Sequence, residues 1–180
     1  MTVELDGFEA KLLQRLAEEL LELLDDVGSA ASAASPMSPA SSADPLESAL
    51  AIGPTQPPDD PALARLLPDG YHDDPEAAAE FRRFTEPELR ERKRANARLM
   101  LATLGGLADD GATVVLDDGQ AHAWLYALND LRLALGSRLD VQEDYERQVD
   151  SLDEDDPRRP VFAIYEWLTE IQDTLVRALR

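Results

Sequence analysis

The chain has 180 residues, with 17 lysines and arginines against 37 aspartates and glutamates, so its formal net charge is -20. This length suits one domain with appended segments and a core of its own. General electrostatic binding to nucleic acid is disfavoured, because it needs a positive surface. The chain contains no cysteine, which excludes disulfides, thiolate metal sites and a nucleophilic cysteine within it.

Two further features bear on location. No apolar run approaches the ~20 residues that a membrane-spanning helix needs. Residues 1–7 lack the basic start of a signal peptide. We therefore expect a cytoplasmic protein that does not enter a membrane.

The first folded segment is predicted to be an amphipathic helix. Apolar residues recur at spacings of three and four from Phe8 to Val27, and Gly28 is placed to end the helix. Leu13 and Leu21 widen the apolar stripe beyond what one neighbour covers. The helix is therefore expected to be central in a bundle or shared with a second subunit, which favours a homodimer.

Residues 28–59 are predicted to be a flexible linker. Small and polar residues with several prolines dominate this stretch, as in GSAASAASPMSPASSAD and PTQPPDD. Such a composition buries too little apolar surface to offset the entropy of ordering the chain. Residues 45–52 could form one helical turn within it.

The main domain is predicted at 60–180, and it opens with three helix start signals. Asp60 caps and Pro61 begins a short helix, and Asp74 with Pro75 repeats the signal before a helix at 77–84. Thr85 is predicted to be the N-cap of a third helix, over 86–104, with Glu88 completing a capping box. Gly105 and Gly106 are expected to end it.

The second half of this domain contains one predicted strand and two predicted helices. Residues 112–116 (ATVVL) form a β-branched run, and residues 3–5 are the best candidate to pair with it. A helix capped by Asp117 and Gln120 is expected to run to Gly136, and a final helix to span 160–179. Residues 140–157 are acidic and expected to be mostly solvated. The fold class predicted from these elements is all-α, a bundle of about five helices with at most one short β ribbon.

The residue patterns that usually carry catalysis or bind metal are missing. There is no Gly-x-Ser-x-Gly sequence, no glycine-rich phosphate loop and no Glu-x-x-His pair. His72 and His122 lie far apart in the sequence, and the carboxylates at 18–26 are expected to face solvent. We therefore predict no catalytic residue, no metal site, no cofactor and no enzymatic activity.

Charge is unevenly distributed along the chain. Arg90, Arg94 and Arg98 are four residues apart, so they share one helix face. The acidic stretch at 140–156 carries opposite charge. The two segments are expected either to neutralise each other or to form a polarised surface that contacts a charged protein partner.

Five further residues are candidates for partner contact or for internal structure. Asn129, Asp130 and Arg132 interrupt a leucine-rich helix, and Asp130 lies close enough to its core stripe to need a partner, for which Arg94 or Arg98 are plausible. Tyr126 and Trp167 fall outside their core stripes. Each is either an interface anchor or packed in a crevice.

Four segments resemble a known family: DPALARLLPDGY (60–71), FTEPELRERKRANARLML (84–101), AHAWLYALNDLRLALG (121–136) and YEWLTEIQDTLV (165–176). They are similar to a small actinobacterial family with a domain of unknown function, which includes the actinomycetes oxidative stress regulator. The resemblance covers the first helix and residues from about 60 to the end. The block around Trp124 to Gly136 is its most specific part.

The resemblance implies a cytoplasmic, non-enzymatic regulator of transcription in oxidative stress. It implies action by protein contact with an alternative sigma factor. Direct sequence-specific binding of nucleic acid is not expected, because the net charge of -20 repels phosphate. An accessory role in Clp-dependent proteolysis, through contact with the Clp adaptor, is the alternative. The chain departs from the family in one respect. The thiol sensing attributed to the oxidative stress regulator needs a pair of cysteines, and this chain contains none.

Overall fold

The computed structural model describes residues 1–25, 53–105 and 112–179. Within these residues it contains six helices and a two-stranded ribbon, which confirms the predicted all-α class. In chain order the elements are β1 (Thr2–Leu5), α1 (Gly7–Asp25), α3 (Pro61–Leu66), α4 (Pro75–Leu104), β2 (Ala112–Val115), α5 (Asp118–Leu139), α6 (Tyr145–Asp150) and α7 (Arg159–Ala178).

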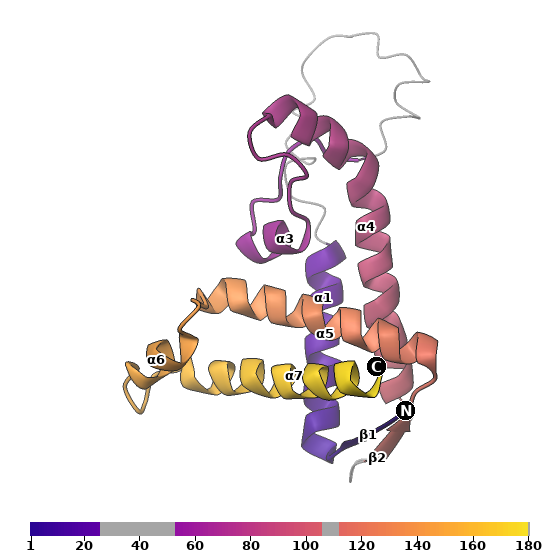
Figure 1. Ribbon diagram of the computed structural model, residues 1–180, viewed down its shortest axis with the longest axis vertical. Helices are drawn as coiled ribbons and strands as arrows, with labels where there is room; N and C mark the ends of the chain where they lie inside the picture. Colours follow the sequence, from indigo (N-terminus) through magenta and orange to yellow (C-terminus); the bar gives the residue numbers. More distant parts are fainter. Residues whose placement is uncertain (26–52, 106–111, 180) are drawn as a thin grey trace, which may run out of the picture.

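Two antiparallel helix pairs form the body of the molecule. Figure 1 shows α1 and α4 running alongside each other, with α5 and α7 crossing them. The short α3 packs on α5, and the ribbon lies beside the start of α1. The contacts between α4 and α5 bring two segments of the predicted partner surface together.

The core lies where these helices cross. Leu13, Leu20 and Leu24 of α1 are buried together with Trp124 of α5 and Leu168 of α7. Leu12, Leu21 and Leu23 pack partly against the same core. Because α1 contacts both α4 and α5, neighbours within the chain account for its broad leucine face. The homodimer stays a prediction.

Most of the predicted helix starts are confirmed by their caps. The Asp60 side chain accepts hydrogen bonds from the amides of Ala62 and Leu63, and Asp74 accepts one from Ala77. Asp117 and Gln120 form a reciprocal capping box at the start of α5. Such caps satisfy amides that have no partner within the helix.

The third predicted start is wrong, because α4 is one helix of 30 residues with Pro87 inside it. The Thr85 hydroxyl donates to the carbonyl of Phe81, four residues earlier, and caps nothing. Figure 1 shows the first turns of α4 inclined to the rest, as expected for a helix with an internal proline. Its C-terminal cap is Gly105, in agreement with the predicted end.

The end of α5 and the acidic stretch also differ from expectation. The helix passes through Gly136 to Leu139 and is closed by Asp140 in the left-handed conformation, with φ 52°. The stretch at 140–157 is not merely a solvated loop. It contains α6, and Leu152 is buried in a small apolar cluster with Leu139 and Phe162.

The β ribbon is confirmed. β1 and β2 pair antiparallel, with Thr2 opposite Val115 and Leu5 opposite Ala112. Val114 and Leu116 bury their side chains in the core, whereas Val115 is exposed. Residues 28–52 of the predicted linker, its possible turn and the expected stop at Gly28 lie outside the described residues.

Candidate partner-binding surface

Three of the predicted contact residues line one hollow between α4 and α5. Tyr126, Asn129 and Asp130 of α5 face Arg92 and Lys93 of α4 across a volume of about 430 Å³. The Tyr126 side chain is 56% exposed. An exposed aromatic ring beside a hollow supplies large contact area at low entropic cost, as is typical of binding surfaces.

Asp130 is buried at the base of this hollow and is paired with Lys93. Its Oδ1 lies 2.5 Å from the Lys93 ammonium nitrogen. Burial raises the pKa of the Asp130 carboxyl above its ordinary value, and the hydrogen bond and charge of Lys93 oppose that rise. The prediction that Arg94 or Arg98 would pair with Asp130 is wrong. Arg94 instead bonds to the end of α1.

The basic face of α4 is largely used within the chain. Arg90, only 7% exposed, donates to the Leu24 carbonyl at 2.6 Å and to Glu86. Arg94 donates to the same carbonyl at 2.8 Å and to Asp25. Two guanidinium groups therefore satisfy the carboxyl end of α1, where the helix dipole is negative.

Arg98 is the exposed member of this face, with 55% of its side chain exposed, and it pairs with Glu91. The expected neutralisation of the arginines by the acidic stretch at 140–156 is not found among the described contacts. Their counter-charges are Glu86, Asp25 and Glu91. The charges of these three arginines are thus balanced by α4 itself and by α1.

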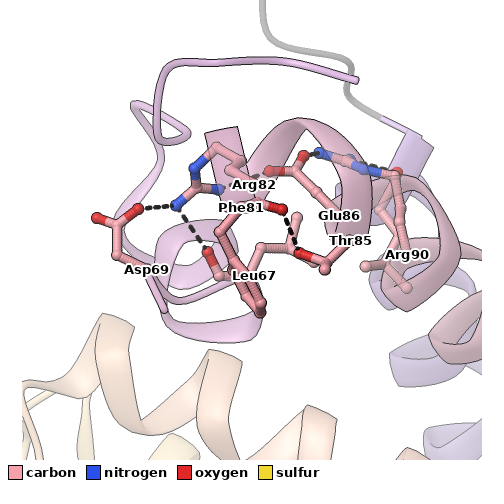
Figure 2. Close-up of polar contacts among 8 residues, drawn as sticks. Leu67, Asp69, Phe81, Arg82, Thr85, Glu86 and Arg90 are labelled. Atoms are coloured by element: carbon pink, nitrogen blue, oxygen red, sulfur yellow. Dashed lines mark hydrogen bonds and ion pairs between the residues drawn. The ribbon is translucent and has the colours of Figure 1, made fainter. Parts of the chain in front are cut away.

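A buried polar network that the sequence reading missed lies beside these residues (Figure 2). Arg82, 4% exposed, donates to Glu86 at 2.5 Å, to Asp69 at 2.6 Å and to the Leu67 carbonyl at 3.2 Å. Glu86 also accepts from Arg90, so one carboxylate serves two guanidinium groups. The spacing of 82, 86 and 90 places them on one helix face, which was the available signal.

Arg82 keeps its charge in this environment. Burial by itself lowers the pKa of the Arg82 guanidinium, but the hydrogen bonds and charges of Asp69 and Glu86 together raise it above its ordinary value. The network therefore ties the turn after α3 and the end of α1 to α4.

Arg132 and Trp167 lie apart from the hollow. The Arg132 guanidinium donates to Gln172 of α7 and stacks 5.2 Å from the centre of the Tyr165 ring. Trp167 is half-buried, and its indole N–H donates to Glu9 at 3.0 Å. Both residues connect helices within the chain, in the crevice packing that was one of the two expectations for Trp167.

A second hollow of about 310 Å³ continues from the first along α4. The two hollows share Leu89 and Arg92, and the second is also lined by Leu67, Pro68 and Phe81. We call the two together the α4 groove. Phe81 is exposed at one end and Tyr126 at the other. Sequence reading missed this half of the groove, because it is completed by the turn after α3.

Arg92 stands at the junction of the two hollows. It is exposed and forms no ion pair within the described part of the chain, whereas its neighbour Lys93 is paired. The buried acids beside the groove, Glu86 and Asp130, are already held by basic side chains. Among the described residues the groove thus combines apolar and polar side chains, and its exposed charged side chains are Arg92 and Glu88, one of each sign.

The described residues contain neither a cluster of potential metal ligands nor a helix that could span a membrane. Over 1–25, 53–105 and 112–179 no three His, Cys, Asp or Glu side chains are grouped so that they could hold a metal ion. In the same ranges no helix has the length and apolar character required to cross a bilayer.

Comparison with known proteins decides the family. Residues 1–179 match the family described as "Domain of unknown function (DUF2017)". The chain belongs to this family. The resemblance read from the four sequence segments is thereby confirmed.

Curated relatives of this DUF2017 protein are named as regulators. The "Oxidative stress regulator AosR" of Mycobacterium tuberculosis (strain H37Rv) is 38% identical over 186 residues, which cover 95% of this chain and 78% of the relative. The protein of that name from Mycobacterium bovis has the same identity and coverage. A relative from Mycobacterium leprae is 35% identical over 189 residues, which again cover 95% of this chain and 78% of the relative. No solved structure gives a significant match.

Proposed function

We propose that this protein is a non-enzymatic regulator in oxidative stress that acts by binding another protein, an alternative sigma factor, in the cytoplasm. The observation that carries the proposal is the similarity to proteins named oxidative stress regulators over 95% of the chain. The sigma factor comes from the family resemblance. Because the chain has no cysteine, a thiol-based redox signal has to be sensed by the partner.

The α4 groove is the proposed contact surface. Tyr126 and Phe81 are exposed at its ends, and Arg92 offers a positive charge between its two hollows. Aromatic and arginine side chains dominate the binding energy of many protein interfaces. The groove suits a helix or loop of the partner whose apolar side chains lie along it and whose acidic side chain faces Arg92, away from the exposed Glu88.

The test is a full-length double variant, Tyr126→Ala with Arg92→Glu. It is affinity-purified from cells and compared with the wild type for the amount of sigma factor that it captures. Both side chains are exposed and outside the buried network, so the variant should fold. We expect capture of the sigma factor to fall by at least roughly 30-fold, because losing one interface hot spot costs about 2 kcal/mol or more. Phe8→Ala is the matched control, since Phe8 is an aromatic residue 74% exposed on α1 that does not line the groove.

Quantitative mass spectrometry of the captured proteins, with and without oxidant, provides the measurement. Equal capture by the wild type and the double variant would discard the groove as the contact surface. Capture of the Clp adaptor in place of a sigma factor would favour the accessory role in proteolysis. The α4 face that contains Arg90 and Arg98 is tested better by Arg98→Glu than by Arg90→Glu. The Arg90 variant would place a second acid in the buried network beside Glu86.

A further inference from the structure

Backbone groups at the outer edge of β1 have no hydrogen-bond partner among the residues that the structure describes. Met1 and Leu116 exchange two hydrogen bonds, of 2.7 and 2.8 Å. In an antiparallel pair, residues alternate between those bonded to the partner strand and those directed away from it. Given the register, Val3 directs its backbone N–H and C=O toward β2, whereas Thr2 and Glu4 direct theirs to the opposite edge.

A hollow of about 470 Å³ runs along this open edge. Four consecutive residues of β1, Thr2 to Leu5, line it together with residues of α7. Because successive side chains of a strand point to opposite faces, a hollow over one face would meet only alternate residues. Contact with all four residues, and with none of β2, places the hollow at the edge of β1 that β2 does not cover.

The chemistry of the hollow is apolar at the floor and acidic at the rim. Trp167 and Ile171 of α7 are half-buried side chains that pack on the core below it. Among the described residues, the charged ones that line it are Glu4, Glu9 and Glu170, and none of the lining residues is basic. Glu9 is held by the Trp167 indole, but the exposed carboxylates of Glu4 and Glu170 have no hydrogen-bond or ion-pair partner among the described residues.

We propose that the open edge of β1 binds an extended, basic segment of a partner protein. The segment adds a third strand beside β1, bonding to the outward N–H and C=O groups of Thr2 and Glu4. Its apolar side chains lie against Trp167 and Ile171, and its lysines or arginines face Glu4 and Glu170. Strand addition of this kind takes affinity from main-chain bonds and specificity from the side chains beside the edge.

Charge decides between this partner and a second copy of the chain. Two copies paired through β1 would bring acidic rims together, and like charges across adjacent strands are destabilising. A basic segment instead meets opposite charge, and the net charge of -20 attracts it from a distance. The proposal is independent of the α4 groove, because no residue of that groove lines this hollow.

The probe is a short synthetic peptide of alternating lysine and valine, added to the full-length chain. Trp167 lines the hollow while Trp124 is fully buried, so a change in tryptophan fluorescence reports occupation of the site. Hydrogen exchange adds a backbone readout. On binding, the amides of Thr2 and Glu4 should become protected, and that of Val115, on the far edge of the ribbon, should not.

The decisive variant is Thr2→Pro, with Val115→Pro as its matched control. These residues are paired across the ribbon, and both direct their N–H away from the ladder, toward opposite edges. Proline is tolerated at such edge positions, so each variant keeps the ladder bonds. We expect Thr2→Pro to weaken peptide binding roughly tenfold, since it removes one main-chain bond, and Val115→Pro to leave it unchanged. Circular dichroism checks that both fold.

A second pair of variants tests the acidic rim. Glu4→Lys with Glu170→Lys should weaken binding of the lysine–valine peptide several-fold, and Glu18→Lys, on an exposed part of α1, should not. A glutamate–valine peptide should not bind the wild type. The proposal is overturned if the wild type does not bind the lysine–valine peptide, or if Thr2→Pro binds it as tightly. It is also overturned if the wild type self-associates and this self-association is abolished by Thr2→Pro but not by Val115→Pro. In that case a second copy of the chain occupies the edge of β1.

Discussion

Asp130 and Lys93 form a pair whose two members contribute unequally to the fold. The Asp130 side chain is buried, with 3% of its surface exposed, whereas the Lys93 side chain is 14% exposed. Removing the lysine leaves a buried charge without a partner. Removing the charge of the acid leaves an ammonium group that can still reach water along its flexible stem. The same side chains also form the base of the α4 groove.

We therefore predict that Lys93→Met lowers the free energy of unfolding at neutral pH by about 3 kcal/mol, the usual effect of leaving a buried ion without its partner. Asp130→Asn, the matched control, should cost less. Urea unfolding of the purified variants measures both. Equal stability of Lys93→Met and the wild type, or a larger loss in Asp130→Asn, would contradict this account of the pair.

The pH dependence of Lys93→Met follows from the same burial. Burial raises the pKa of Asp130 above its ordinary value of 3.8. Between the unfolded and folded pKa values the folded chain binds more protons, so the free energy of unfolding falls as pH rises through that interval. Removal of Lys93 raises the folded pKa further and widens the interval. The free energy of unfolding of the variant should therefore rise more than that of the wild type as the pH is lowered from neutral.

At the scale of a helix, α4 is held together across Pro87 by tertiary contacts. Pro87 has no N–H to donate to the Arg83 carbonyl, four residues earlier. Gly53 packs against this part of α4: a Cβ added to it would lie 2.6 Å from the Arg83 carbonyl oxygen and 2.9 Å from the Pro87 ring. The neighbouring Arg82–Glu86–Arg90 network is continuous on both sides of the proline.

Gly53→Ala is therefore expected to destabilise the protein by about 1–3 kcal/mol, because the added methyl group has to displace backbone atoms of α4. Gly119→Ala is the control. Its added Cβ would meet an ordinary contact of 3.4 Å with the Asp117 carboxylate, and alanine favours the helix. Thermal unfolding of both variants measures the difference. A Gly53→Ala variant as stable as Gly119→Ala would show that the segment before α3 can move away from α4.

For the whole molecule, repulsion among acidic side chains is the main electrostatic feature. The net charge of -20 opposes the compact state. The best-defined ion pairs, those of Arg82 and Arg90 with Glu86, are buried and so poorly screened by salt.

Added sodium chloride should consequently raise the midpoint of thermal unfolding between about 0.01 and 0.15 M, as the Debye length falls from about 30 to about 8 Å. Circular dichroism at several salt concentrations measures it. A midpoint that fell with salt would mean that exposed ion pairs outweigh the repulsion. Light scattering in the same series would also test the predicted homodimer.

The sequence allowed most of the local structure to be predicted, because the signals for helix starts and strands act over a few residues. The three-and-four spacing of leucines predicts α1, Asp60, Asp74 and Asp117 predict helix starts, and the β-branched run at 112–116 predicts its strand. It also led to the family, through blocks such as the one around Trp124. The charge of -20 and the absence of cysteine need no structure to interpret.

Which of these local signals prevail, and which side chains come into contact, depends on how the helices pack against one another. Thr85 and Pro87 together read as a helix start, but the network of Arg82, Glu86 and Arg90 with the end of α1 keeps α4 continuous. Lys93 pairs with Asp130, 37 positions away, because α4 and α5 cross there. The α4 groove and the hollow beside β1 arise in the same way, since each is lined by elements distant in sequence and local spacing carries no information about such contacts.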